Sequence, residues 1–186
     1  MLDTVKSRVN GLDLAALGET VQAIQADPAK ALVEFDVTTR WSDQARSETI
    51  VDGYTIGGER VARSHKIVAD EPLELLGGDT SANPQELLMA AFNACITVGY
   101  VAGAAIKGIK LDSLEIKTRG RLDLRGFLDL SDHVSPGYEK VEYEVNIKGD
   151  GSPRDFEEIH QRVMQTSPNY FNISRPIRLN GTLNIG

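Results

Sequence analysis

The single cysteine of the chain, Cys95, is the side chain best suited to nucleophilic chemistry. A cysteine thiolate attacks electrophiles such as a peroxide oxygen, and a nearby cation favours that thiolate. The candidate cations come from the N-terminal half of the chain and are Arg40, Arg46, Arg60 and Arg63. The alternative is a structural role, because a lone cysteine in an apolar segment usually behaves as a small buried hydrophobe. Composition alone leaves both roles open.

The other residue types exclude several kinds of site. One cysteine excludes an internal disulfide framework and a cysteine-rich zinc site. The histidines (His65, His133 and His160) lie far apart and show no metal-binding spacing, so we expect no metal and no cofactor. The chain has 20 Lys and Arg against 27 Asp and Glu, a net charge of −7, and no long basic run. A nucleic-acid partner is therefore not expected.

A helix is predicted to carry Cys95 from Pro84 to Lys107. Asn83 is a favourable N-cap, Pro84 fits the first helical position, and Glu86 can reach back to the cap. Gly108 supplies the stop signal, because glycine tolerates the left-handed backbone that ends many helices.

This predicted helix has no charged residue over the 20 positions from Leu87 to Ile106. That length would suffice for a membrane span. These 20 positions include six alanines and the polar residues Asn93 and Thr97. This composition instead favours a helix buried on all sides in a protein core. We therefore expect no membrane partner.

The surrounding segments predict an α+β fold with a largely antiparallel sheet. Residues 1–30 form a predicted N-terminal helical extension, capped by Asp13 and ended by Asp27-Pro28, and residues 31–186 form the main domain. Alternating apolar residues predict strands over 33–37, 46–51, 61–68, 109–124, 141–147 and 177–185. A second helix is predicted to open at Ser152-Pro153.

The run from Asn83 to Cys95 (NPQELLMAAFNAC) resembles the signature helix of the OsmC/Ohr family, in which an alanine-rich stretch leads to the peroxidatic cysteine. Asp70-Glu71-Pro72, with the glycines at 77 and 78, is similar to the segment that precedes that helix in the family. The segment 134–138 and the Ser167-Pro168 step also fit. The resemblance covers residues 31–186, which become a predicted OsmC-like domain.

The resemblance implies an intertwined homodimer with a long central helix and active sites at the dimer interface. It also implies reduction of small organic hydroperoxides by Cys95 in defence against oxidative stress. In the family an arginine from a turn between early strands faces the cysteine. Arg46 matches that region best, and Arg40 is the second choice.

Two departures from the family pattern bear on this activity. The second, resolving cysteine of the family is replaced by Ser167, so an external thiol has to resolve the oxidised Cys95. The acidic residue that orients the arginine falls on Gln85, with Glu86 beside it. An amide oxygen holds a guanidinium more weakly than a carboxylate does.

The sequence thus predicts a one-cysteine hydroperoxide reductase with Cys95, Arg46, Gln85 and Glu86 as candidate site residues. The alternative is a non-catalytic protein that binds a small molecule on the same scaffold. The N-terminus shows no apolar secretory segment, so a cytoplasmic location is expected.

Overall fold

The computed structural model describes residues 8–186, which form two compact units. The first unit ends at Leu88 and the second begins at Met89. The predicted N-terminal extension lies partly outside the described residues, and its boundary at residue 30 stays a prediction. Within it, helix α1 spans Leu14–Ala26, and its N-cap Asp13 accepts a hydrogen bond from the Ala16 amide at 3.1 Å, as predicted.

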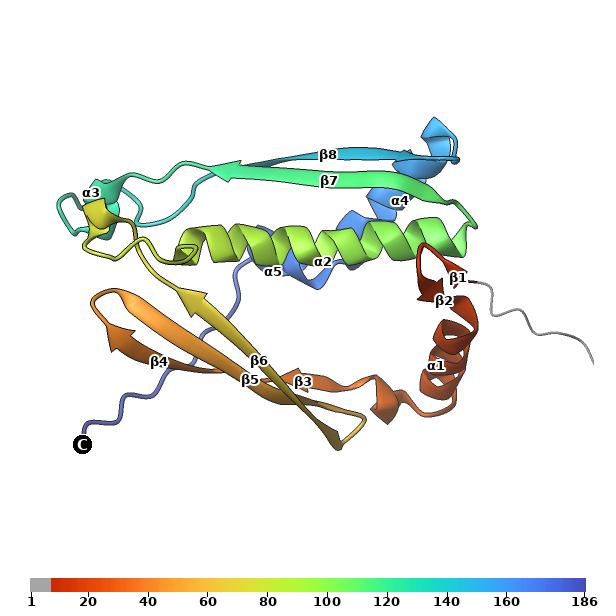
Figure 1. Cartoon of the computed structure of the whole chain (residues 1–186), viewed down its shortest axis with the longest axis horizontal. Helices are drawn as coiled ribbons and strands as arrows, with labels where there is room; N and C mark the ends of the chain where they lie inside the picture. Colours follow the sequence, from red (N-terminus) through yellow and green to blue (C-terminus); the bar gives the residue numbers. More distant parts are fainter. Residues whose placement is uncertain (1–7) are drawn as a thin grey trace, which may run out of the picture. The chain divides into compact units, whose positions relative to one another are not determined.

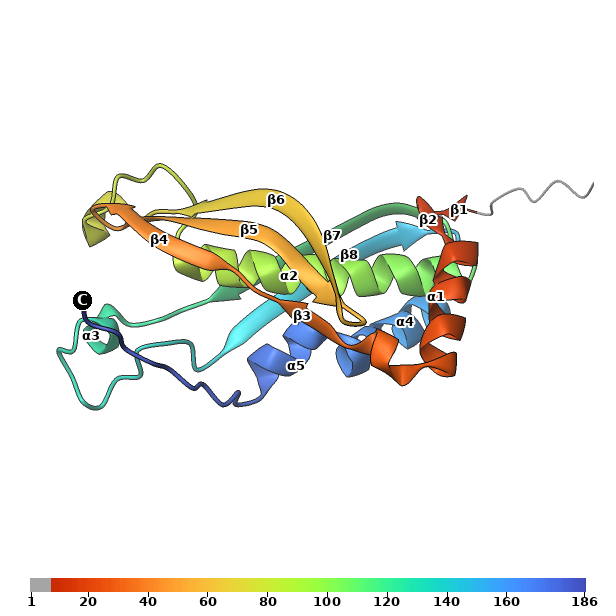
Figure 2. The same ribbon diagram turned by 90° about the horizontal axis from the view of Figure 1, so that it is seen from below.

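The first unit is built around an antiparallel sheet in which β5 is the central strand (Figures 1 and 2). It pairs with β3, β4 and β6. Gly57 and Gly58 turn the chain between β5 and β6, with φ values of 55° and 85° that favour glycine. The strands are β3 (Val33–Phe35), β4 (Thr38–Asp43), β5 (Arg46–Ile56) and β6 (Glu59–Ala69). The smaller elements are β1 (Arg8–Val9), β2 (Leu12–Asp13), η1 (Pro28–Ala31) and η2 (Leu73–Leu75).

Asp70 fixes the loop that joins this sheet to the long helix. Its carboxylate is 1% exposed and accepts hydrogen bonds from the backbone amides of Glu71, Gly78 and Thr80 and from the Thr80 hydroxyl. The Thr80 hydroxyl bond, 2.7 Å long, is the main cause that lowers the pKa of Asp70 to about 2. The loop is therefore tied at both ends to one buried anion.

The long helix α2 spans Pro84–Ile106, close to its predicted bounds. Asn83 Oδ1 accepts from the Glu86 amide at 2.8 Å, and Glu86 Oε2 accepts from the Asn83 amide at 2.9 Å. This reciprocal pair is the predicted capping box. At the other end Gly108 has a φ of 74°, as its role as a stop signal requires.

The second unit packs α2 and α4 (Pro153–Thr166) against the hairpin of β7 (Leu111–Gly120) and β8 (Val141–Gly149). Phe92, Ile96 and Tyr100 of α2 form the buried cluster with Ile159 and Val163 of α4. Alternate residues of the two strands pack against that cluster: Leu114, Ile116, Tyr143, Val145 and Ile147. The unit also contains α3 (Leu124–Phe127) and α5 (Pro168–Ser174).

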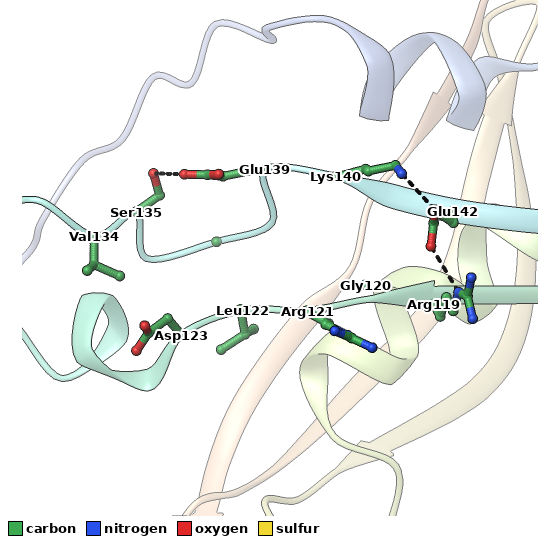
Figure 3. Close-up of a pocket in the computed structure, with 11 residues that line it drawn as sticks. Arg119, Gly120, Arg121, Leu122, Asp123, Val134, Ser135, Glu139, Lys140 and Glu142 are labelled. Carbon is green, nitrogen blue, oxygen red and sulfur yellow. Dashed lines mark hydrogen bonds and ion pairs between the residues drawn. The ribbon is translucent and has the colours of Figure 1, made fainter.

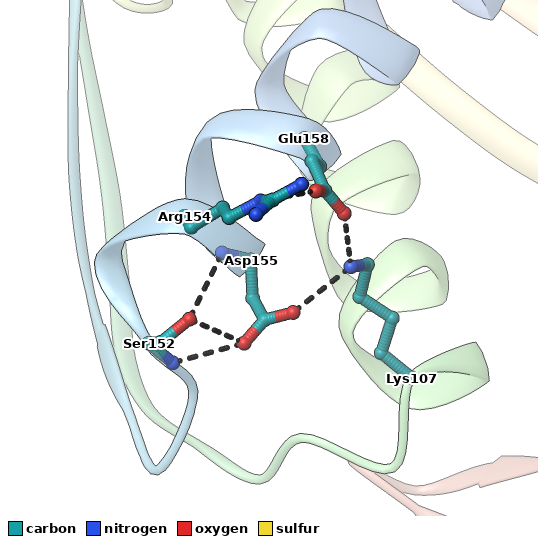
Figure 4. Close-up of polar contacts among 5 residues, drawn as sticks. All are labelled: Lys107, Ser152, Arg154, Asp155 and Glu158. Atoms are coloured by element: carbon teal, nitrogen blue, oxygen red, sulfur yellow. Dashed lines mark hydrogen bonds and ion pairs between the residues drawn. The ribbon is translucent and has the colours of Figure 1, made fainter.

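Ion pairs close the unit at the end of α2 (Figure 4). Lys107 Nζ lies 2.9 Å from Asp155 Oδ1 and 2.6 Å from Glu158 Oε2, both on α4. Ser152 caps α4 and donates to Asp155 at 2.6 Å. The Ser152 bond, followed by that of Lys107, lowers the pKa of Asp155 to about 2. These contacts fix the register of α4 along α2.

By length and composition alone, α2 could cross a membrane. One face of it, however, lies in the core, where Ile96, Tyr100 and Ala104 are at most 1% exposed. Its other face carries exposed apolar residues, including Val98 at 68% and Ile106 at 66%. The structure therefore contains a core helix of the second unit, and the other elements of that unit leave one apolar face of it uncovered.

Three of the predicted strands differ from the structure, in burial, in length or in existence. Val33 and Phe35 were expected on a half-buried strand, yet all three residues of β3 are exposed. The strand predicted over 109–124 ends at Gly120, because Asp123 caps α3 through the Arg125 amide. Residues 177–185 do not form the predicted closing strand, since no described strand pairs with them.

Candidate functional site

Cys95 lies near the middle of α2, partly buried, with its sulfur facing the start of α5. Its Sγ is 3.3 Å from Ser167 Oγ. Ser167 links α4 to α5 and is 7% exposed. The structure thus brings the single thiol into contact with the residue that the resemblance had placed at the position of a resolving cysteine.

Two further contacts hold α5 against the turn of α2 that carries the thiol. Ser167 Oγ accepts a hydrogen bond from the Tyr170 amide at 3.2 Å and so caps α5. Asn169 Nδ2 donates to the Ala91 carbonyl oxygen at 2.8 Å, one helical turn before Cys95. Neither α5 nor the role of Asn169 was predicted from the sequence. The local signal was Ser167-Pro168 itself, since serine followed by proline is a common helix start.

Asn93, two residues before the cysteine, ties the same part of α2 to the sheet. Its Nδ2 donates to the Ile116 carbonyl oxygen at 3.4 Å, and its Oδ1 accepts from the Thr118 hydroxyl at 2.5 Å. These bonds explain a polar residue in an otherwise apolar helix, because a buried amide is stable only when its polar atoms are paired. Cys95 is therefore held between β7 on one side of its turn and α5 on another.

The two candidate arginines lie on the sheet of the first unit, around one carboxylate. Arg46 Nη2 is 3.3 Å from Glu48 Oε1, and Arg40 is the register partner of Glu48 on the neighbouring strand. Lys66 Nζ also contacts Glu48, at 2.7 Å. The hydrogen bond from Lys66, with the charges of Lys66 and Arg46, lowers the pKa of Glu48.

Glu48 is a neighbour of Arg46 that was not predicted from the sequence. The available signal was its spacing from Arg46, because residues two apart on a strand share a face. Its carboxylate provides Arg46 with the charged partner that Gln85, an amide, cannot supply.

Gln85 and Glu86 lie in the first turn of α2 and do not meet the cysteine of their own chain. Glu86 is engaged in the capping box with Asn83. Cys95 follows Glu86 by nine residues, a rise of about 14 Å along the helix. The structure joins Cys95 with Ser167 in the second unit, while the predicted site residues Arg46, Gln85 and Glu86 belong to the first unit.

A cavity of about 670 Å³ lies in the second unit, between the ends of β7 and β8 and the loop that joins them (Figure 3). Cys95 is not among the residues that line it. Two of its cations, Arg119 and Lys140, contact the same carboxylate, that of Glu142, at 3.0 and 2.6 Å. Among residues 8–186, no group of three or more His, Cys, Asp or Glu side chains is placed to hold a metal ion.

The elements described here define an α+β protein in which a long helix carries a lone thiol along antiparallel strands. Solved structures share this fold. An OsmC-like protein from Mycoplasma pneumoniae is 15% identical, with 76% of this chain and 87% of that chain covered and a TM-score of 0.56. An OsmC-like protein of unknown function from Vibrio cholerae is 16% identical, with 74% and 92% covered and a TM-score of 0.55.

The family model for OsmC-like proteins matches residues 77–180, which is more than half of the chain. The chain therefore belongs to the OsmC-like family, as the Asn83–Cys95 run predicted. No curated protein matches it in sequence.

Proposed function

We propose that the chain is a thiol-dependent peroxidase that reduces small organic hydroperoxides through Cys95. The observation that supports this most directly is the position of the thiol. Cys95 is partly buried, at the junction of α2 and α5, 3.3 Å from the residue that replaces the resolving cysteine. Membership of the OsmC-like family agrees with this chemistry. The proposed setting is oxidative stress defence in the cytoplasm.

In the proposed first step, the Cys95 thiolate attacks the terminal oxygen of the hydroperoxide. An S–O bond forms as the O–O bond breaks, and the electron pair leaves with the alkoxide. The alkoxide takes up a proton and departs as an alcohol. The cysteine, oxidised by two electrons, remains as a sulfenic acid.

Arg46 is the proposed cation for this step, with Arg40 as the second candidate. A guanidinium favours the thiolate and stabilises the negative charge that develops on the leaving oxygen. Glu48 limits the freedom of Arg46 through their 3.3 Å ion pair. Gln85 and Glu86 are proposed to lie at the edge of the site and not to contact the attacking sulfur.

External thiols are proposed to complete the cycle, because a serine cannot form a disulfide with Cys95. One thiol attacks the sulfenic sulfur, which gives a mixed disulfide and releases water. A second thiol attacks that mixed disulfide, restores Cys95 and leaves as the disulfide of the two external thiols.

The proposed assembly is a homodimer. The uncovered apolar face of α2 and the C-terminal segment 177–185 both support it. In that segment Leu179, Leu183 and Ile185 are 83–88% exposed. They alternate with polar residues, which is the pattern of a β-strand, although the segment pairs with no described strand of the single chain. A second copy of the chain offers strands with free edges to pair with it.

The test is to treat the folded protein with an organic hydroperoxide in the presence of a dimedone-type reagent. Mass spectrometry is expected to show the adduct on Cys95 and no disulfide within the chain. Excess peroxide without the trapping reagent is expected to yield the sulfinic acid, since no thiol of the same chain is available. An unmodified Cys95 after prolonged exposure would refute the peroxidase and leave the small-molecule-binding protein in its place.

A further inference from the structure

We propose that Ser167 is a positioning residue of the Cys95 site, whose hydroxyl donates a hydrogen bond to the sulfur and favours the thiolate. This inference deepens the proposed function, because the attacking species is the thiolate. Ser167 then acts on the thiol directly, and does not merely replace a resolving cysteine.

The direction of the hydrogen bond follows from what each atom can offer. Ser167 Oγ accepts from the Tyr170 amide at 3.2 Å, so one lone pair of that oxygen is already used. Its proton is free to turn toward Cys95 Sγ at 3.3 Å. A thiolate has no proton and can only accept. In the reactive form of the site, Ser167 must therefore be the donor.

Burial increases the effect of this hydrogen bond. Ser167 is 7% exposed, so little water competes for its hydroxyl. In such surroundings a thiolate is destabilised unless a donor replaces the lost water, and a hydrogen bond to the charged form offsets that cost. Loss of the Ser167 hydroxyl should therefore lower the fraction of Cys95 that is present as thiolate.

The backbone around Ser167 fixes where the hydroxyl points. The serine is the last residue before α5 and caps it, while Asn169 fastens the same turn to the Ala91 carbonyl oxygen at 2.8 Å. Ala91 lies one turn before Cys95 on α2. The Asn169–Ala91 contact holds α5 against α2. It therefore positions the Ser167 hydroxyl near the Cys95 sulfur independently of the Cys95–Ser167 hydrogen bond.

The test measures the thiolate without using peroxide. The rate of Cys95 alkylation by iodoacetamide is recorded from pH 5 to pH 10 for the wild type and for Ser167→Gly. Glycine is nearly as good an N-cap as serine, so this variant removes the hydroxyl with little loss of helix stability. We expect alkylation near neutral pH to fall roughly tenfold and the midpoint of the profile to move to higher pH. Ser167→Thr, which keeps a hydroxyl, should restore most of the wild-type profile.

The matched control is Ser152→Gly. Ser152 caps α4 as Ser167 caps α5, by accepting from the amide three residues further on, but its hydroxyl contacts the Asp155 carboxylate and not a thiol. This variant should leave the alkylation profile unchanged. The same profile for Ser167→Gly and the wild type would overturn the inference, even if Cys95 reduces peroxide. A shifted profile in a protein that does not react with peroxide would uphold the hydrogen bond and reject the peroxidase.

Discussion

Gly99 of α2 lies so close to Val163 of α4 that a Cβ atom on the glycine would be 3.0 Å from Val163 Cγ2. One turn later, a Cβ on Gly103 would be 3.0 Å from Ile159 Cγ2. The two glycines therefore form a groove into which the side chains of α4 fit. The closeness of α2 and α4 in the core depends on the absence of side chains at these two positions.

Gly99→Leu should destabilise the fold by about 1–3 kcal/mol, the usual cost of overpacking a filled core. Urea denaturation followed by circular dichroism measures the change. The control is Gly18→Ala in α1, where no atom lies within 4 Å of the added Cβ. That substitution should stabilise its helix by up to about 1 kcal/mol, because alanine is the better helix former. Unchanged stability of Gly99→Leu would contradict the groove.

Ser167→Cys should form a disulfide with Cys95 after mild oxidation, because the two side chains are already in contact at 3.3 Å. Closing a loop of this length stabilises a protein by about 4 kcal/mol in the chain-entropy model. Non-reducing peptide mapping detects the bond. Ser152→Cys is the control, since Ser152 lies with Asp155 at the Lys107 end of α2, about 18 Å along the helix from Cys95. Two free thiols in Ser167→Cys would show that α5 is placed differently in solution.

Arg46→Ala should slow the reaction of Cys95 with an organic hydroperoxide up to roughly tenfold near neutral pH, equal to about 1.4 kcal/mol. The reason is loss of the cation that favours the thiolate and receives the leaving oxygen. Stopped-flow measurement of thiol consumption gives the rate. Arg125→Ala is the control, because Arg125 pairs with Asp123 at 2.5 Å and is not among the candidate cations. An effect of Arg40→Ala in place of Arg46→Ala would move the role to Arg40.

Asp70 gives the fold a defined dependence on acid. Its pKa is about 2 in the folded chain, below an unfolded value of about 4. Its contribution to stability is therefore complete above pH 4 and is lost as the pH falls toward 2. Thr80→Val removes the hydroxyl donor, raises this pKa and should move acid unfolding to higher pH, as followed by circular dichroism.

The control for that acid effect is Thr39→Val, which breaks the neutral hydroxyl pair of Thr39 and Thr49 at 2.8 Å. Its effect on stability should not vary between pH 2 and pH 5, because neither partner is charged. A Thr80→Val protein with the wild-type acid transition would show that the backbone donors alone hold Asp70.

The C-terminal segment should join two chains. Leu179→Asp combined with Leu183→Asp places charges on its apolar side and is expected to give monomers in light scattering at micromolar concentration. The matched control places the same charges on the other side, as Asn180→Asp with Asn184→Asp, and should remain dimeric. A wild-type monomer, or a dimer that survives the leucine substitutions, would reject this contact.

Local signals predicted the helix that carries the thiol. Asn83, Glu86 and Gly108 define its ends through bonds and angles within a few residues, so no distant contact was needed. Short-range chemistry was therefore sufficient to predict this helix.

Contacts that join distant parts of the chain were harder to predict. Glu48 and Lys66 are far apart in sequence, and their contact at 2.7 Å depends on the register of β5 on β6. Residues 177–185 show that a strand pattern alone does not make a strand. Alternation describes a segment that can pair, but pairing requires a partner, and no described strand of this chain provides one.

The shared oxygen of Ser167 has a thermodynamic consequence. It accepts from the Tyr170 amide while its proton faces Cys95. If docking of α5 favours the thiolate, linkage requires that the thiolate favours docking of α5 by the same factor. The protection of the Tyr170 amide against deuterium exchange should then rise as the thiol loses its proton. This one backbone amide would report the charge on the sulfur without any label on the cysteine.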